Sequence, residues 1–171
     1  MARPILAKSI LAKPPRPVMT ASAIVFVIAA ATILAALAFE HLGGYASCPL
    51  CLEERYAYYF GVPASAVAFL LARGYATGPA RILLLVIALA FLANAVVGVY
   101  HAGVEWKWWA GPTACSGGFE LTWGEGGIVD TPIIRCDEAS WRFLRLSFAG
   151  WNAVVSALLA AVAAYGAAQK R

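Results

Sequence analysis

Charged residues are scarce in this chain of 171 residues: only 13% are Asp, Glu, Lys or Arg, while 62% are hydrophobic and the mean hydropathy is +0.74. Soluble domains carry about 25% charged and 45–50% apolar residues. The shortage excludes an ordinary soluble domain, because one soluble core cannot bury so large an apolar surplus. We therefore predict an integral membrane protein, and the length suits a single domain.

Charge is missing altogether from several long runs. The first, at 18–39, has 22 uncharged residues, which is enough to cross ~30 Å of hydrocarbon as a helix. A cleaved signal peptide is the alternative for this run, but its apolar region would be about 7–15 residues long. We predict an all-α membrane protein, a bundle of four transmembrane helices at 18–39, 53–72, 82–103 and 146–168.

Acidic residues are absent from the chain ends and from one connection. The segments 1–17, 73–81 and 169–171 hold eight basic residues, whereas all nine acids, all four cysteines and all six tryptophans fall on the other side. Lys and Arg in short loops stay in the cytoplasm. We therefore expect cytoplasmic termini and two extracytoplasmic loops, at 40–52 and 104–145. The net charge of +4 then reflects orientation and gives no support to nucleic-acid binding.

Cysteine is also scarce, and its four positions are informative. Cys48 and Cys51 form a C-x-x-C pair in the first outer loop, and Cys115 and Cys136 lie in the second. An even number of cysteines in an oxidising compartment indicates disulfides. Two inert structural disulfides are one interpretation. A C-x-x-C bridge, however, closes a very short loop and stabilises little, which favours reversible redox chemistry.

Zinc is the competing use of four cysteines, and it fits poorly. A structural zinc site usually pairs two closely spaced cysteine knuckles. Here twenty residues separate Cys115 from Cys136, so the second pair lacks that spacing. We expect no metal site.

The residues after the C-x-x-C pair suit a reactive thiol. If the second helix begins near Leu52, Cys51 lies at its N-terminal end, where the helix dipole favours a thiolate. Arg55 follows four positions later and can share that face of the helix. The alternative for Arg55 is an arginine that extends to the lipid headgroups. His41 and His101 each stand alone at a helix end, a position typical of interfacial histidines.

These residues together resemble a known family. The run CPLCLEERYAY at 48–58 is similar to the signature C-x-L-C-x-x-(Q/E)-R-x-x-Y of the DsbB family of disulfide bond formation proteins. Further landmarks follow in the same order over roughly 44–156: YHAGVE at 100–105, GPTAC at 111–115, Cys136 with Asp137 and Trp141, and AGWN at 149–152.

The resemblance implies a thiol relay in the bacterial inner membrane. A soluble periplasmic thioredoxin-like protein of the DsbA type would attack a Cys115–Cys136 disulfide, with Cys115 forming the mixed disulfide. Electrons would pass through a transient bridge between the two loops to Cys48 and Cys51. The protein would then be a dithiol:quinone oxidoreductase that supports disulfide formation.

The same resemblance implies a quinone as cofactor, either a ubiquinone or a menaquinone. Cys51, as a thiolate beside Arg55, would reduce it near the outer ends of the helices, with His101 as a neighbour. The chain departs from the usual pattern at Ser47 and Arg145, and we expect neither residue to touch the redox core. The long outer loop is similar to that of a branch with narrower client sets, so the soluble partner is expected to be a dedicated one.

Two other readings remain open. A non-catalytic protein with four membrane helices and two structural disulfides would leave its thiol count unchanged by quinone. An epoxide-reductase-type redox enzyme shares the dithiol and quinone chemistry, but such proteins carry their C-x-x-C late in the bundle. In this chain the pair follows the first predicted helix, which counts against that reading.

Overall fold

Four long helices make up most of the part of the chain that the structure describes. The structure is a computed structural model and describes residues 16–115, 119–124, 127–132 and 135–169. The helices are α2 (Arg16–His41), α3 (Pro49–Arg73), α4 (Thr77–Glu105) and α5 (Phe148–Ala168), with a short 3₁₀ helix η1 at Thr113–Cys115. The expected cytoplasmic arm at 1–17 and tail at 169–171 lie mostly outside the described residues.

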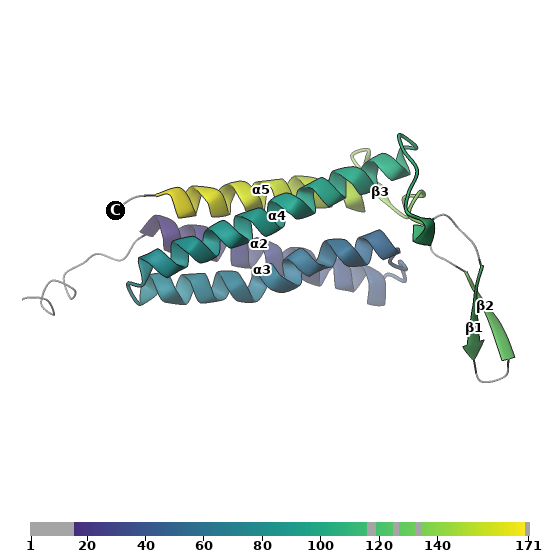
Figure 1. Cartoon of the computed structure of the whole chain (residues 1–171), viewed down its shortest axis with the longest axis horizontal. Helices are drawn as coiled ribbons and strands as arrows, with labels where there is room; N and C mark the ends of the chain where they lie inside the picture. The colour runs from purple at the N-terminus through teal and green to yellow at the C-terminus, as the bar shows by residue number, and fades with distance from the viewer. Residues whose placement is uncertain (1–15, 116–118, 125–126, 133–134, 170–171) are drawn as a thin grey trace, which may run out of the picture.

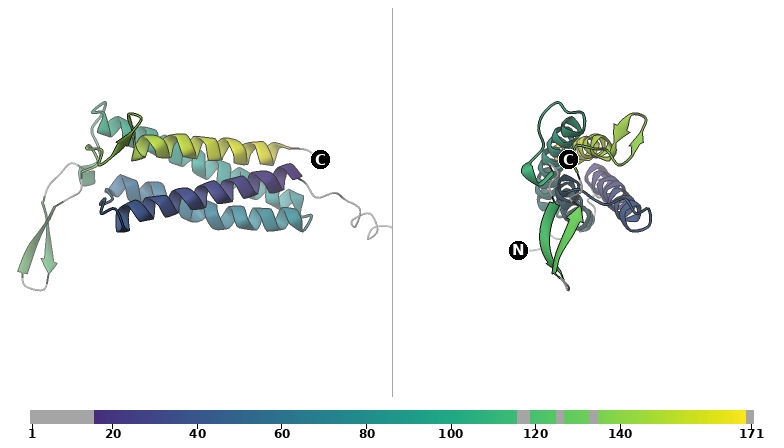
Figure 2. Two further views of the ribbon diagram at one scale, coloured as in Figure 1. Left: turned by 180° about the vertical axis from the view of Figure 1, so that it is seen from behind. Right: turned by 90° about the vertical axis from the view of Figure 1, so that its right-hand side faces the viewer.

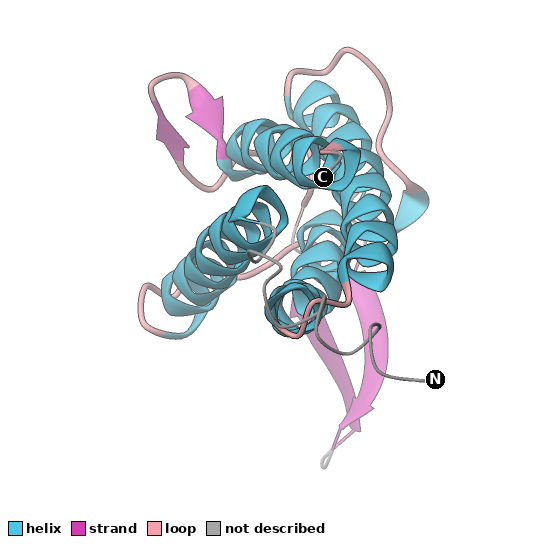
Figure 3. Ribbon diagram, turned by 90° about the vertical axis from the view of Figure 1, so that its left-hand side faces the viewer, coloured by secondary structure: helices cyan, strands magenta, loops and turns pink. Residues whose placement is uncertain are grey.

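The helices form an elongated bundle in which each packs against two neighbours. α2 contacts α3 and α5, and α4 contacts the same two helices from the other side. The end-on view shows this ring of four helices (Figure 3). The short α3–α4 connection lies at one end and the two longer loops lie at the other, so that sequence neighbours run antiparallel (Figure 1), which is the arrangement of an up-down bundle.

The bundle has a buried apolar core and an apolar outer surface. Leu84, Ile87, Phe91 and Leu159 are completely buried between the helices. Large apolar side chains are exposed on all four helices, including Leu34, Leu70, Ile82 and Leu158. A helix bundle that is apolar on its outside suits lipid rather than water as its solvent.

Three of the described helices, α2, α4 and α5, are long and apolar enough to cross a membrane. α3 has 25 residues but is less apolar, because Glu53, Glu54 and Arg55 occupy its first two turns. The helical bundle that the sequence predicts is therefore present. The four-span topology, including a crossing by α3, stays a prediction.

A polar cluster links three helices within the bundle. Asn94 of α4 donates from Nδ2 to Ser156 Oγ (2.9 Å) and to Asn152 Oδ1 (3.2 Å), both on α5. Tyr58 of α3 donates its hydroxyl to the same Asn152 oxygen at 2.7 Å. Polar side chains at membrane depth need such partners, because lipid tails cannot form hydrogen bonds with them and water is scarce there.

The second outer loop contains strands that the all-α prediction did not include. β1 (Phe119–Gly124) pairs antiparallel with β2 (Gly127–Pro132), so that Phe119 lies opposite Pro132. β3 (Arg142–Phe143) pairs with β4 (Leu146–Ser147) just before α5. The β1–β2 hairpin extends away from the bundle, and β3–β4 lies on another side of it (Figure 2). The physical reason for the difference is that 119–124 alternates apolar and polar residues, which is a strand period.

Candidate redox site

The C-x-x-C pair lies at the start of α3. Cys48 is the N-cap residue, and its sulfur accepts the backbone N–H of Cys51 at 3.2 Å. The helix begins at Pro49, three residues earlier than the predicted start near Leu52. Proline is well suited to the first helical position, because its fixed φ matches the helix and it has no N–H to leave unpaired. The sulfur at the positive end of the helix dipole is therefore that of Cys48.

Cys48 and Cys51 are both free thiols in direct contact. Their sulfurs are 2.7 Å apart, Cys48 is buried and Cys51 is partly exposed. The hydrogen bond shared with Cys51 lowers the pKa of the Cys48 thiol, and burial opposes this only in part. The thiolate therefore forms more readily on Cys48 than on an ordinary cysteine.

Cys115 and Cys136 form a disulfide at the end of the bundle where α3 begins, packed against Cys48 and Leu50. Both are buried, and their Cα atoms are 5.0 Å apart. The chain next to Cys136 is held by Asp137, which accepts from Lys107 and from Arg135. The hydrogen bond from Arg135, followed by that from Lys107, lowers the pKa of the Asp137 carboxyl, so that it stays ionised over the whole neutral range.

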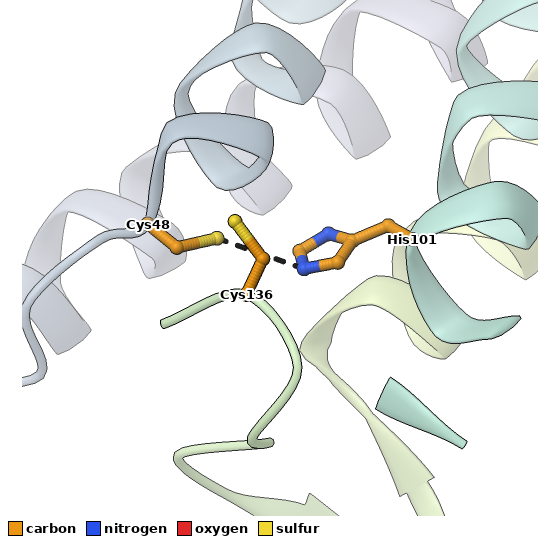
Figure 4. Close-up of side chains that lie close together, drawn as sticks. All are labelled: Cys48, His101 and Cys136. Atoms are coloured by element: carbon orange, nitrogen blue, oxygen red, sulfur yellow. Dashed lines mark hydrogen bonds between the residues drawn. The ribbon is translucent and has the colours of Figure 1, made fainter. Parts of the chain in front are cut away.

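The two cysteine pairs meet at a histidine. Cys48 Sγ, Cys136 Sγ and a ring nitrogen of His101 all lie within 4.8 Å of one another. Figure 4 shows the three side chains pointing toward each other from the start of α3, the second outer loop and α4. Because Cys136 belongs to the disulfide, this arrangement brings the Cys115–Cys136 disulfide next to the Cys48 thiol.

His101 also connects Cys48 to a carboxylate. Its Nε2 is 3.6 Å from Cys48 Sγ, and its Nδ1 is 2.9 Å from Glu54 Oε1. All three side chains are buried, with residue exposures of 4%, 1% and 6% for Cys48, His101 and Glu54. A carboxylate on Nδ1 fixes the orientation of the imidazole and leaves Nε2 to face the thiol. This is the arrangement of a nucleophile, a base and an orienting group.

A metal ion is the other species that thiol and imidazole ligands of this spacing can bind. The sulfur of Cys136, however, is bonded to Cys115. The trio therefore does not offer three free ligands, and its geometry suits thiol–disulfide exchange better.

Arg55 has different partners from those that the sequence suggests. Its Nη1 donates to Glu40 at the end of α2, and its Nη2 donates to Ser47 Oγ at 2.5 Å. The expectation that Ser47 does not touch the redox core is therefore wrong, because its hydroxyl accepts from Arg55. The arginine ties α2 and the first loop to α3. Its side chain is 11% exposed, so it does not simply extend into the headgroup region.

A cavity of about 580 Å³ lies beside this site, between α2, α3 and α5. Cys51, Glu54 and Arg55 all line it, whereas Cys48 and His101 do not. The rest of the lining is mainly apolar and aromatic, including Phe39, Tyr45, Trp141, Phe148 and Trp151. Aromatic walls with a few polar groups are typical of a site for a flat, weakly polar ring. A quinone ring fits this lining, since it is flat and carries only two polar oxygens.

Comparison with known proteins agrees with this geometry. Residues 19–166 match the family model described as disulfide bond formation protein DsbB. The chain belongs to the DsbB family. It is also 32% identical over 142 residues to "Disulfide bond formation protein B" of Marinobacter nauticus, a match that covers 80% of this chain and 83% of the relative. A search of solved structures found no match.

Membership of the DsbB family makes this a membrane protein of disulfide bond formation, as the resemblance implied. In this DsbB-family chain, sequence reasoning named all four cysteines, Arg55 and His101. It assigned no role to Glu54, which lies between His101 and the cavity, or to Glu40, the partner of Arg55. The signals for Glu54 are its place at the (Q/E) position of the family signature and the rule that an acid in the first turns of an apolar helix needs a partner.

Proposed function

We propose that this protein is a dithiol:quinone oxidoreductase of the bacterial inner membrane. In this proposal it oxidises a soluble periplasmic thioredoxin-like protein of the DsbA type and passes the electrons to a membrane quinone. The observation that carries the proposal is the position of Cys48, which contacts Cys51 on one side and lies beside Cys136 on the other. A structural pair of disulfides has no need of this contact.

The relay begins at the buried Cys115–Cys136 disulfide. A thiolate of the partner attacks Cys115, and Cys136 leaves as a thiolate. Because Cys136 faces Cys48, it attacks that sulfur when Cys48 and Cys51 are joined, forming a Cys48–Cys136 bond and releasing Cys51. The second thiolate of the same partner molecule then displaces Cys115. Cys115 attacks Cys136, which restores the Cys115–Cys136 disulfide and releases Cys48. Each step exchanges one S–S bond for another, so no oxidant is needed until Cys48 and Cys51 must be reoxidised.

The quinone would be held in the cavity between α2, α3 and α5. When bound there, it would accept two electrons and two protons. Cys51 is the cysteine that lines this cavity, so its sulfur is the point at which electrons leave the protein. Arg55 lines the cavity too, fixed by Glu40 and Ser47, and gives the cavity a positive charge. Ala35 and Phe39 on α2 are exposed lining residues, which gives a membrane quinone a lateral entry.

The proposal is tested with purified protein in detergent, a reduced thioredoxin-like dithiol protein and a short-chain quinone. We expect catalytic loss of quinone absorbance with the wild type and none above background with Cys51→Ser. Thermal unfolding of Cys51→Ser should match the wild type, since Cys51 makes no disulfide in this structure. Absence of quinone loss in the wild type, with all four cysteines stably paired, would establish the structural alternative.

A further inference from the structure

Reoxidation of the dithiol must release protons as well as electrons. When the Cys48–Cys51 bond forms, two S–H bonds break, and two electrons and two protons reach the quinone, which becomes a hydroquinone. Cys51 lines the cavity and can lose its proton there directly. Cys48 does not line the cavity and is 4% exposed, so its proton needs another route.

Cys51 is joined to Cys48 in this step, so it is His101, among the other described residues, that contacts the Cys48 sulfur and can take this proton. His101 Nε2 lies 3.6 Å from its sulfur, and the other ring nitrogen contacts Glu54 Oε1 at 2.9 Å. A neutral imidazole that donates from Nδ1 to a carboxylate has a lone pair on Nε2. That lone pair faces the thiol, so His101 can act as its base.

Glu54 joins this pair to the cavity. It belongs to the same helix as Cys51, one turn further on, and it lines the cavity although it is 6% exposed. Its position is unusual, because a carboxylate buried within an apolar bundle is costly unless it is partnered or has a function. The contacts therefore run without a gap from Cys48 through His101 to Glu54 and the cavity.

We propose that Cys48, His101 and Glu54 form a proton path that carries the thiol proton of Cys48 into the cavity where the electrons are accepted, a role that rests on the proposed function. As the Cys48–Cys51 bond forms, the proton on Cys48 Sγ moves to His101 Nε2. The proton on His101 Nδ1 moves along the hydrogen bond to Glu54 Oε1. Glu54 then delivers a proton to the quinone. His101 is a catalytic residue in this path, but toward the thiol and not as part of the quinone cavity.

The contact between Cys48 and His101 can be tested without quinone. In protein with Cys51→Ser, Cys115→Ser and Cys136→Ser, ¹³Cβ-labelled Cys48 reports its own ionisation by NMR. We expect His101→Gln to raise the midpoint of this titration by about 1–3 pH units, because the thiolate loses an adjacent cation. The other ionisable groups that face His101 are Glu54 and Glu105, whose Oε1 is 4.0 Å from Nε2. His41→Gln is the matched control, because His41 is exposed at the end of α2.

The role of Glu54 is tested by kinetics. Glu54→Gln keeps an acceptor for His101 Nδ1 but cannot carry the proton, so we expect quinone kcat to fall by about 10²–10⁴-fold, with quinone KM unchanged within about twofold. Glu53→Gln, at the exposed neighbouring position, should behave as the wild type.

An unshifted Cys48 titration in His101→Gln, or an unchanged kcat in Glu54→Gln, would overturn the proton path. If His101→Gln does not fold, the NMR titration is made on His101→Asn, where a raised midpoint is again expected, since the thiolate again loses the adjacent imidazolium. A wild type that reduces no quinone would overturn the proposed function instead, and the NMR titration would still decide whether His101 acts on Cys48.

Discussion

At the scale of single residues, Cys48 and Cys51 have different surroundings although their sulfurs are in contact. Cys48 is buried at the N-cap of α3 beside Cys136, whereas Cys51 is partly exposed and lines the cavity. One dithiol can therefore exchange with the second loop through its first sulfur and with the cavity through its second. The N–H of Cys51 and the helix dipole both stabilise negative charge on Cys48, which makes it a good leaving group in this exchange.

This division predicts which bridge between the loops can be trapped. A variant with Cys51→Ser and Cys115→Ser retains only Cys48 and Cys136, whose sulfurs lie in one cluster within 4.8 Å. We expect mild oxidation to join them quantitatively, and peptide mapping by mass spectrometry without reduction to detect the bridge. The reverse variant, Cys48→Ser with Cys136→Ser, retains Cys51 and Cys115 and should bridge far more slowly. Equal rates for the two variants would contradict the division of roles.

Sequence reasoning named the four cysteines, Arg55 and His101, but not the acids that pair with the arginine and the histidine. The C-x-x-C spacing and the family signature are local patterns, so they can be read from a single sequence. Glu54 and His101 are 47 residues apart, and Arg55 and Glu40 are 15 apart. Neither separation is a fixed helical spacing, so only the packing of one helix against another determines these pairs.

At the scale of the helices, small residues decide how closely the bundle can pack. A Cβ added at Gly98 of α4 would lie 2.9 Å from the backbone nitrogen of Ala153 on α5. The backbones of the two helices therefore approach closely at this point, as is common in membrane helix pairs with glycine at the interface. The same interface contains the bonds of Asn94 to Asn152 and Ser156. A local separation of the helices would weaken those bonds as well.

Gly98→Ala is expected to destabilise the protein. The new methyl group meets backbone, which cannot rotate away, so α4 and α5 must move apart at a cost of about 1–3 kcal/mol. Thermal unfolding in detergent should show a lower Tm. Gly78→Ala is the control, because a Cβ there has no heavy atom within 4 Å. A Tm for Gly98→Ala equal to that of Gly78→Ala would mean that the helices do not approach as closely as described.

The helices were predictable from the sequence, but their ends and the strands were not. Runs of uncharged residues locate a helix, whereas its start depends on capping, as the N-cap of Cys48 before Pro49 illustrates. The strands β1 and β2 lie within the loop predicted at 104–145. Alternation over six residues is a weak signal beside a helix of more than twenty, and a hairpin forms only when both strands pair.

At the scale of the whole molecule, the two ends of the bundle differ in chemistry. The ends of α2 and α4 and the start of α3 bring Glu40, Glu54, Arg55, His101 and Glu105 together beside the four cysteines. The other end carries the short connection between α3 and α4, with exposed Arg73. A redox site at one end of an apolar bundle can serve soluble protein partners on one side and a lipid-soluble acceptor within the membrane. The proposed function requires that the end with the cysteines always lies on the same side of the membrane.

The distribution of basic residues predicts that direction, with the cysteine end in the periplasm. In protein with all four native cysteines replaced by serine, Glu138→Cys places one thiol at the exposed outer loop and Gly78→Cys places one at the exposed opposite end. We expect a membrane-impermeant maleimide to label the first in intact spheroplasts and the second only after detergent is added. Labelling of Gly78→Cys alone in intact spheroplasts would invert the topology and place the thiol relay in the reducing cytoplasm. Its disulfides would not persist there, so this one measurement tests the orientation and the feasibility of the chemistry together.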